Sequence, residues 1–155
     1  MTVGQPPPLA RLFAIAYRSF IDGLHTRLAE RGWSDVRPNY GFVLIAARDN
    51  GIQSSEIAVL MGVSKQAASK LIEAMEAAGY VRRDPHPADQ RAKIIHLTAR
   101  GTELLVAVEE IYEELEQTWA DAIGRRQVET VRTGITKALM ETNDGKLPAI
   151  RPPQT

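Results

Sequence analysis

Four polar side chains share one face of a short helix that is predicted to begin after Ser64: Lys65, Gln66, Ser69 and Lys70. The apolar residues of the same segment recur at helical spacing on the opposite side. A helix fits the major groove of B-DNA, where a glutamine can pair with adenine and a lysine can contact guanine or phosphate. The alternative to DNA contact is an ordinary solvent-exposed helix face, because isolated lysines on helices usually face water. The segments on either side favour contact with DNA.

The preceding residues complete a helix-turn-helix pattern. Gly62 stands where the turn between two crossing helices needs a positive φ, and Ser64 can cap the second helix. The first helix is expected to carry Glu56 in its first turn, with Gln53 or Ser54 as its cap. We expect Ser54, Ser55 and Ser64 to make positioning contacts to phosphate.

A charged β-hairpin is predicted to follow Gly79, because the apolar period changes there from 3.6 to 2. Its strands are expected at residues 80–83 and 93–97, with a loop rich in proline and charge between them. Arg91 is best placed to enter the minor groove, and Arg83 and Lys93 would flank it on the DNA backbone.

Longer helices are predicted on both sides of this unit. Apolar spacing indicates one from Leu9 to about Gly32 and a shorter one from Pro38 to the stop at Asn50 and Gly51. Thr98 would cap a long helix, which Gly124 separates from a last one. The apolar face of the first helix is wider than one neighbouring helix needs, so we expect part of it to meet another chain.

Composition and charge exclude several classes of function. Cysteine is absent and no apolar run is long enough to span a membrane, so we expect a cytoplasmic protein without disulfides. The net charge is zero, although residues 101–124 carry seven acidic side chains and no basic one. This acidic face is most simply the solvated side of a long helix.

No motif for catalysis or for a cofactor is present. The three histidines lack metal-ligand spacing, and neither a catalytic triad nor a phosphate-binding glycine loop occurs, so we expect no metal, no cofactor and no enzyme. Aromatic residues could line a small-molecule cavity, although aromatics at helical spacing are more often core. The candidates are Tyr17, Trp33, Tyr40, Phe42 and Tyr112.

The chain resembles the multiple-antibiotic-resistance regulator (MarR) family of winged helix-turn-helix proteins. The resemblance is carried by the helix-turn-helix segment at 54–83, by the wing motif Asp89, Gln90 and Arg91, and by the sequence HLTARGTEL that leads into the long helix. The middle wing residue departs from the family pattern, in which an arginine is common.

The resemblance implies a mainly α fold with a small β-hairpin wing. Residues 9–34 and 99–141 would be dimerisation helices, 35–98 the DNA-binding region, and 1–8 and 142–155 flexible termini. It further implies a homodimer on a palindromic operator, often with a small aromatic or phenolic effector, and a salt bridge from Asp89 that orients Arg91. We therefore expect a dimeric, sequence-specific transcriptional regulator that acts as a repressor. The competing hypothesis is a winged helix that binds protein instead of DNA, which would favour acidic or bulky residues on the recognition face.

Overall fold

The computed structural model describes residues 4–89 and 91–152. Over these residues the chain forms six helices and three short strands. The helices are α1 (Leu9–Glu30), α2 (Tyr40–Ala46), α3 (Ser54–Met61), α4 (Lys65–Ala77), α5 (Ala99–Ile123) and α6 (Arg125–Glu141). The strands are β1 (Ile52–Gln53), β2 (Val81–Pro85) and β3 (Lys93–Leu97).

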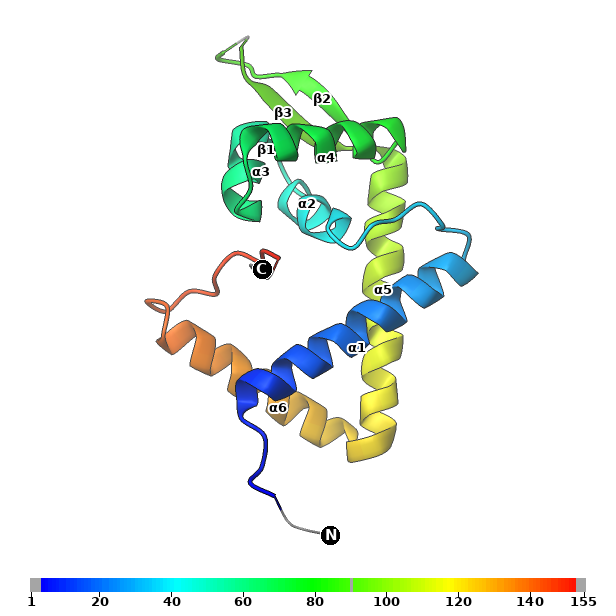
Figure 1. The fold of residues 1–155 in the computed structure, drawn as a ribbon, viewed down its shortest axis with the longest axis vertical. Helices are drawn as coiled ribbons and strands as arrows, with labels where there is room; N and C mark the ends of the chain where they lie inside the picture. Colours follow the sequence, from blue (N-terminus) through cyan, green and yellow to red (C-terminus); the bar gives the residue numbers. More distant parts are fainter. Residues whose placement is uncertain (1–3, 90, 153–155) are drawn as a thin grey trace.

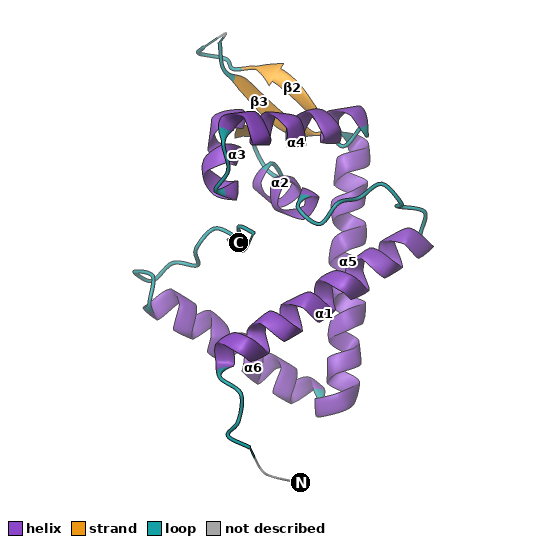
Figure 2. Ribbon diagram, in the orientation of Figure 1, coloured by secondary structure: helices purple, strands orange, loops and turns teal. Residues whose placement is uncertain are grey.

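Helix α5 is the longest element, and the others are arranged along it (Figure 1). Helix α1 crosses α5, and α6 folds back from the C-terminal end of α5. At the N-terminal end of α5 lie α2, α3, α4 and the sheet, with the β2–β3 hairpin projecting beyond α4 (Figure 2). This arrangement confirms the predicted mainly α, winged helix-turn-helix fold.

The turn between α3 and α4 forms as its sequence requires. Gly62 adopts a φ of +65°, in the left-handed region that glycine enters without steric cost. The hydroxyl of Ser64 accepts from the Ala67 backbone N–H at 3.1 Å and caps α4. At the start of α3 the cap position falls on Gln53, whose backbone N–H donates to the Glu56 carboxylate at 3.1 Å.

The sheet contains one strand, β1, that the sequence pattern does not reveal. The three strands pair antiparallel in the order β1-β3-β2, and Ile52 of β1 lies opposite Ile95 of β3. Strand β1 has only two residues, which is too short for an alternating pattern. Strand β2 runs to Pro85, two residues beyond the predicted end, because its ladder with β3 continues to the pair Pro85 and Lys93.

A single apolar core joins the winged part to α1 and α5. Tyr80, at the junction of α4 and β2, is its largest fully buried side chain, with Leu28 of α1 and Ile111 of α5 also fully buried. Helix α2 is shorter than predicted: it ends at Ala46, and residues 47–50 form turns before Gly51. No helix among the described residues combines the length and apolarity that crossing a membrane would require.

Candidate nucleic-acid interface and associated cavities

The predicted recognition face is open. Lys65, Gln66 and Lys70 are exposed on α4, and within residues 4–89 and 91–152 their side chains make neither a hydrogen bond nor an ion pair. The opposite face of α4 is buried against the core through Ala68, Leu71, Ile72 and Met75. One side of α4 thus presents two lysine ammonium groups and a glutamine amide to a ligand, and packing against the core holds the other side.

A hollow of about 230 Å³ lies beside this face, lined by five polar side chains and by Ile72. It brings together five of the predicted DNA-binding residues from α3, α4 and β2: Ser54, Ser55, Lys65, Ser69 and Arg83. Hydroxyls and cations are the groups that bind phosphate oxygens in protein–DNA complexes. The hollow is therefore suited to a phosphate of the DNA backbone.

Arg83 is less free than the sequence suggests. One of its terminal nitrogens donates to the Ser69 backbone carbonyl at 3.5 Å, and its Nε lies 3.7 Å from the Glu76 carboxylate. These contacts fasten β2 to α4, so Arg83 lies at the wall of the hollow rather than beside Arg91.

The wing residues belong to the β2–β3 hairpin, which projects beyond α4 (Figure 1), and none of them lines the hollow as described. Arg91 and Lys93 are exposed, and Gln90 lies outside the described residues. The expected salt bridge between Asp89 and Arg91 is wrong for this structure. The Asp89 carboxylate instead accepts from the Arg91 backbone N–H at 2.9 Å, because a short acidic side chain readily bonds its own backbone two residues on. Asp89 thus shapes the loop, and among residues 4–89 and 91–152 no ion pair holds the Arg91 guanidinium.

The acidic face of α5 forms ion pairs with arginines of α1, of α6 and of the turns that follow α1 and α2. Glu114 accepts from Arg27 at 2.6 Å and also from Arg31, which reaches Glu110 at 3.1 Å. Arg48 pairs with Glu109, and Arg132 of α6 with Glu116. The prediction that this face is only the solvated side of a helix is incomplete, because its ion pairs also hold α1 and α6 to α5.

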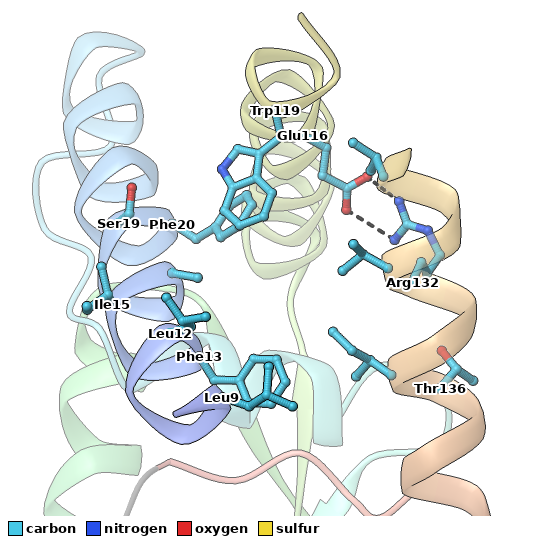
Figure 3. A pocket seen from close by; sticks show the side chains of 14 residues that line it. Leu9, Leu12, Phe13, Ile15, Ser19, Phe20, Glu116, Trp119, Arg132 and Thr136 are labelled. Carbon is cyan, nitrogen blue, oxygen red and sulfur yellow. Dashed lines mark hydrogen bonds and ion pairs between the residues drawn. The ribbon is translucent and has the colours of Figure 1, made fainter. Parts of the chain in front are cut away.

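An apolar groove of about 700 Å³ lies between α1, the C-terminal part of α5, and α6 (Figure 3). The α1 side contributes Leu9, Leu12 and Phe13, which are 67%, 43% and 48% exposed. Apolar side chains of α6 line the other wall, and within the described part of the chain only the pair Glu116 and Arg132 brings charge into the groove (Figure 3). A groove this apolar on a protein surface indicates an interaction site.

A second, smaller cavity of about 80 Å³ lies between α1, α2, α5 and the linker at 36–38. Three of the predicted pocket residues line it: Tyr17, Phe42 and Tyr112. The other two lie elsewhere, because Tyr40 is buried in the core and Trp33 packs against Tyr80 with ring centroids 6.2 Å apart.

The sequence prediction missed most of the other lining residues, among them two ionisable ones, His25 of α1 and Arg37 of the linker. Burial lowers the pKa of His25, against the opposing charge of Asp22, and burial raises the pKa values of Tyr17 and Tyr112. The lining is therefore uncharged near neutral pH except at Arg37. No sequence pattern singles out His25 or Arg37, since a lone histidine and a linker arginine are common surface residues. Among the described residues, no three acidic or histidine side chains gather as metal ligands would.

The comparisons with known proteins agree with this geometry. A model described as the MarR family matches residues 34–92. A Thauera aromatica protein named for transcriptional regulation of the hcr operon is 27% identical over 110 residues, 71% of this chain. The match covers 65% of that relative, so the chain spans slightly less than two thirds of its length.

Two solved structures share the fold. The apo form of MarR from E. coli matches with a TM-score of 0.74 and 22% identity, over 88% of this chain and 99% of that one. The MepR–DNA complex of S. aureus matches with a TM-score of 0.65 and 23% identity, over 89% of this chain and all of that one. The match to the MarR family model and the regulatory name of the Thauera aromatica relative agree with the prediction that this chain is not an enzyme.

Proposed function

Because the chain belongs to the MarR family of transcriptional regulators, we propose that it is a homodimeric repressor that binds a palindromic operator and is released by a small aromatic or phenolic effector. The observation that carries DNA binding is the open face of Lys65, Gln66 and Lys70 beside a hollow that is lined by serines and two cations. In this proposal residues 35–98 bind DNA, residues 9–34 with 99–141 form the dimer, and the protein works in the cytoplasm.

Selection of bound sequences from a random pool of duplexes tests the proposal. We expect a palindromic motif with half-sites about one helical turn apart, because two recognition helices of a symmetric dimer read the same bases twice. A pool without enrichment at low salt would favour the competing protein-interaction module.

Lys65→Ala and Arg91→Ala are each expected to weaken binding to the selected duplex by about tenfold, the equivalent of about 1.4 kcal/mol. Lys65 would lose a contact beside the hollow, and Arg91 a contact in the minor groove. Fluorescence anisotropy over a series of salt concentrations measures both effects. If Lys65 contacts phosphate, the slope of log K against log salt should fall by about 0.9.

Lys137→Ala is the matched control, because Lys137 is an exposed lysine of α6 that lies 3.9 Å from Glu141 and far along the chain from the winged part. It should bind the duplex as the wild type does. Equal affinities for Lys65→Ala, Arg91→Ala and this control would remove both residues from the interface.

The dimer is supported by the apolar groove between α1, α5 and α6. Leu9, Phe13 and Ile15 are 67%, 48% and 60% exposed in the single chain, and burying them against a second copy would be favourable. Residues of the same groove come from both ends of the chain, so a partner that fills it would hold α1 and α6 together.

The effector is supported by the smaller cavity, whose described lining is mainly apolar, includes Tyr17, Phe42 and Tyr112, and carries one permanent cation, Arg37. Its volume of about 80 Å³ lies well below that of typical ligand pockets. A bound aromatic molecule would therefore widen it and separate α1 from α2. Such a ligand favours the conformation that accommodates it, and release of DNA follows if that conformation spaces the recognition helices wrongly.

Gly41→Leu is expected to suppress the effector response while leaving DNA binding intact. Gly41 lines the cavity, and a Cβ there meets no atom within 4 Å, so a leucine side chain can fill the space that the ligand needs. Titration of phenols and aromatic acids into the protein–DNA complex should then require at least about tenfold more ligand for release. Gly134→Leu, at an open position on α6, is the control, and equal release by both variants would contradict this placement of the effector.

A further inference from the structure

Arg100 lies where its positive charge is unfavourable unless aromatic rings or negative groups lie close to it. It is the second residue of α5, directly after the Thr98 cap and Ala99, where the helix macrodipole is positive. Its compensation comes from two aromatic rings, because its guanidinium carbon lies 5.1 Å from the ring centroid of Trp33 and 4.9 Å from that of Tyr80. A carboxylate adds to this, with Asp35 at 3.6 Å from a terminal nitrogen.

The same guanidinium reaches the C-terminal end of α4. That end is closed by two backbone bonds, from Gly79 N–H to Glu76 at 3.0 Å and from Tyr80 N–H to Met75 at 2.9 Å. The Nε of Arg100 donates to the carbonyl of Ala78, the C-cap residue, at 3.2 Å. Its charge thus meets the negative end of the α4 dipole, which is favourable.

The linker that leaves α1 is fastened to the same point. The Tyr80 hydroxyl donates to the Asp35 carboxylate, and burial together with this bond raises the pKa of Tyr80 to about 12. The hydroxyl therefore remains a donor at neutral pH. Asp35 directly precedes Val36, which lines the small cavity together with Arg37.

We propose that Arg100 is a positioning residue for DNA recognition: it joins the linker after α1 to the C-terminal end of the recognition helix and so sets the orientation in which α4 enters the groove. The proposal rests on the proposed DNA-binding function and deepens it. Arg100 itself touches no DNA. Because the linker also borders the cavity, a ligand that widens the cavity would move α4 through this joint.

The test compares Arg100→Met with Arg48→Met in binding to the selected duplex. Both variants remove one arginine of an ion pair that involves α5. Arg100 lies on α5 and pairs with Asp35, whereas Arg48 pairs with Glu109 of α5. Among the described residues Arg48 makes no hydrogen bond or ion pair with α4. Anisotropy is measured across salt concentrations, at a temperature where circular dichroism shows every variant folded. We expect Arg100→Met to bind about tenfold more weakly with an unchanged salt slope, since no phosphate contact is removed. Arg48→Met should match the wild type.

Arg100→Lys keeps the charge near Asp35 and the helix end but loses the planar stack on the aromatic rings, so it should recover only part of the affinity. Asp35→Asn keeps the side-chain size and an acceptor for Tyr80, so it should lower the affinity for the duplex by a smaller factor. It replaces Arg100→Met as the test if Arg100→Met does not fold.

Equal affinities for Arg100→Met and Arg48→Met, or a wild-type affinity for Asp35→Asn when Arg100→Met does not fold, would overturn the positioning role. A reduced salt slope would overturn it too, by showing a direct phosphate contact. A wild-type protein that enriches no duplex would instead remove the DNA-binding function on which the inference rests.

Discussion

Gly101→Ala is expected to destabilise the protein by about 3 kcal/mol, because a Cβ cannot be accommodated at this position. It would lie 2.0 Å from the carbonyl oxygen of Tyr80 and 3.0 Å from its carbonyl carbon. That backbone cannot move away cheaply, since the same oxygen accepts from the Thr98 backbone N–H at 3.0 Å. Urea unfolding at a fixed protein concentration should show the loss as a lower midpoint with an unchanged slope.

Gly134→Ala is the matched control, a glycine in an exposed turn of α6 with no atom within 4 Å of the added Cβ. This change should stabilise the protein by up to about 1 kcal/mol, because alanine has the higher helix propensity. If Gly101→Ala unfolds within about 0.5 kcal/mol of the wild type, the close packing of α5 on Tyr80 is not as the structure has it.

Leu12→Asp and Val131→Asp are expected to convert the proposed dimer to monomers and to weaken operator binding by about 100-fold. Each places a carboxylate in the groove between α1, α5 and α6, and burying an unpaired charge is strongly unfavourable. The DNA affinity falls because a monomer engages one half-site and loses the effective concentration that links the two. Sedimentation velocity measures the first effect, and anisotropy with the selected duplex measures the second.

Val106→Asp separates loss of the dimer from a general effect of added charge. Val106 is a 50% exposed valine of α5 and does not line the groove. It should remain dimeric and bind DNA normally. Groove variants that sediment as the wild type does would show that this face is not the contact between copies.

Much of the fold follows from local sequence signals. Ser64 caps α4, Gly62 makes the turn and Thr98 caps α5, because each of these effects depends on residues only two to four positions away. The amphipathic pattern of α4 also determines which side faces the core, and the open side is the predicted recognition face. These features require no knowledge of distant contacts.

Other features of the candidate sites depend on contacts between residues far apart in the chain. Arg31 and Glu114 are 83 positions apart, and neither periodicity nor a motif pairs them. Aromatic character likewise does not tell Trp33 from Tyr17 and Phe42. Trp33 packs against Tyr80, whereas Tyr17 and Phe42 line the smaller cavity.

The sequence alone therefore determined the helix-turn-helix, its reading face and the wing, because helical period, caps and turn residues act locally. Only the tertiary structure decided that Arg83 is held against α4 and that Arg100 meets the C-terminal end of this helix. Each of these side chains has several neighbours of suitable charge along the sequence, and the packing of α5 against Tyr80 selects among them for Arg100. The predicted recognition face can thus be read from the sequence, whereas the contacts of Arg83 and Arg100 with α4 cannot.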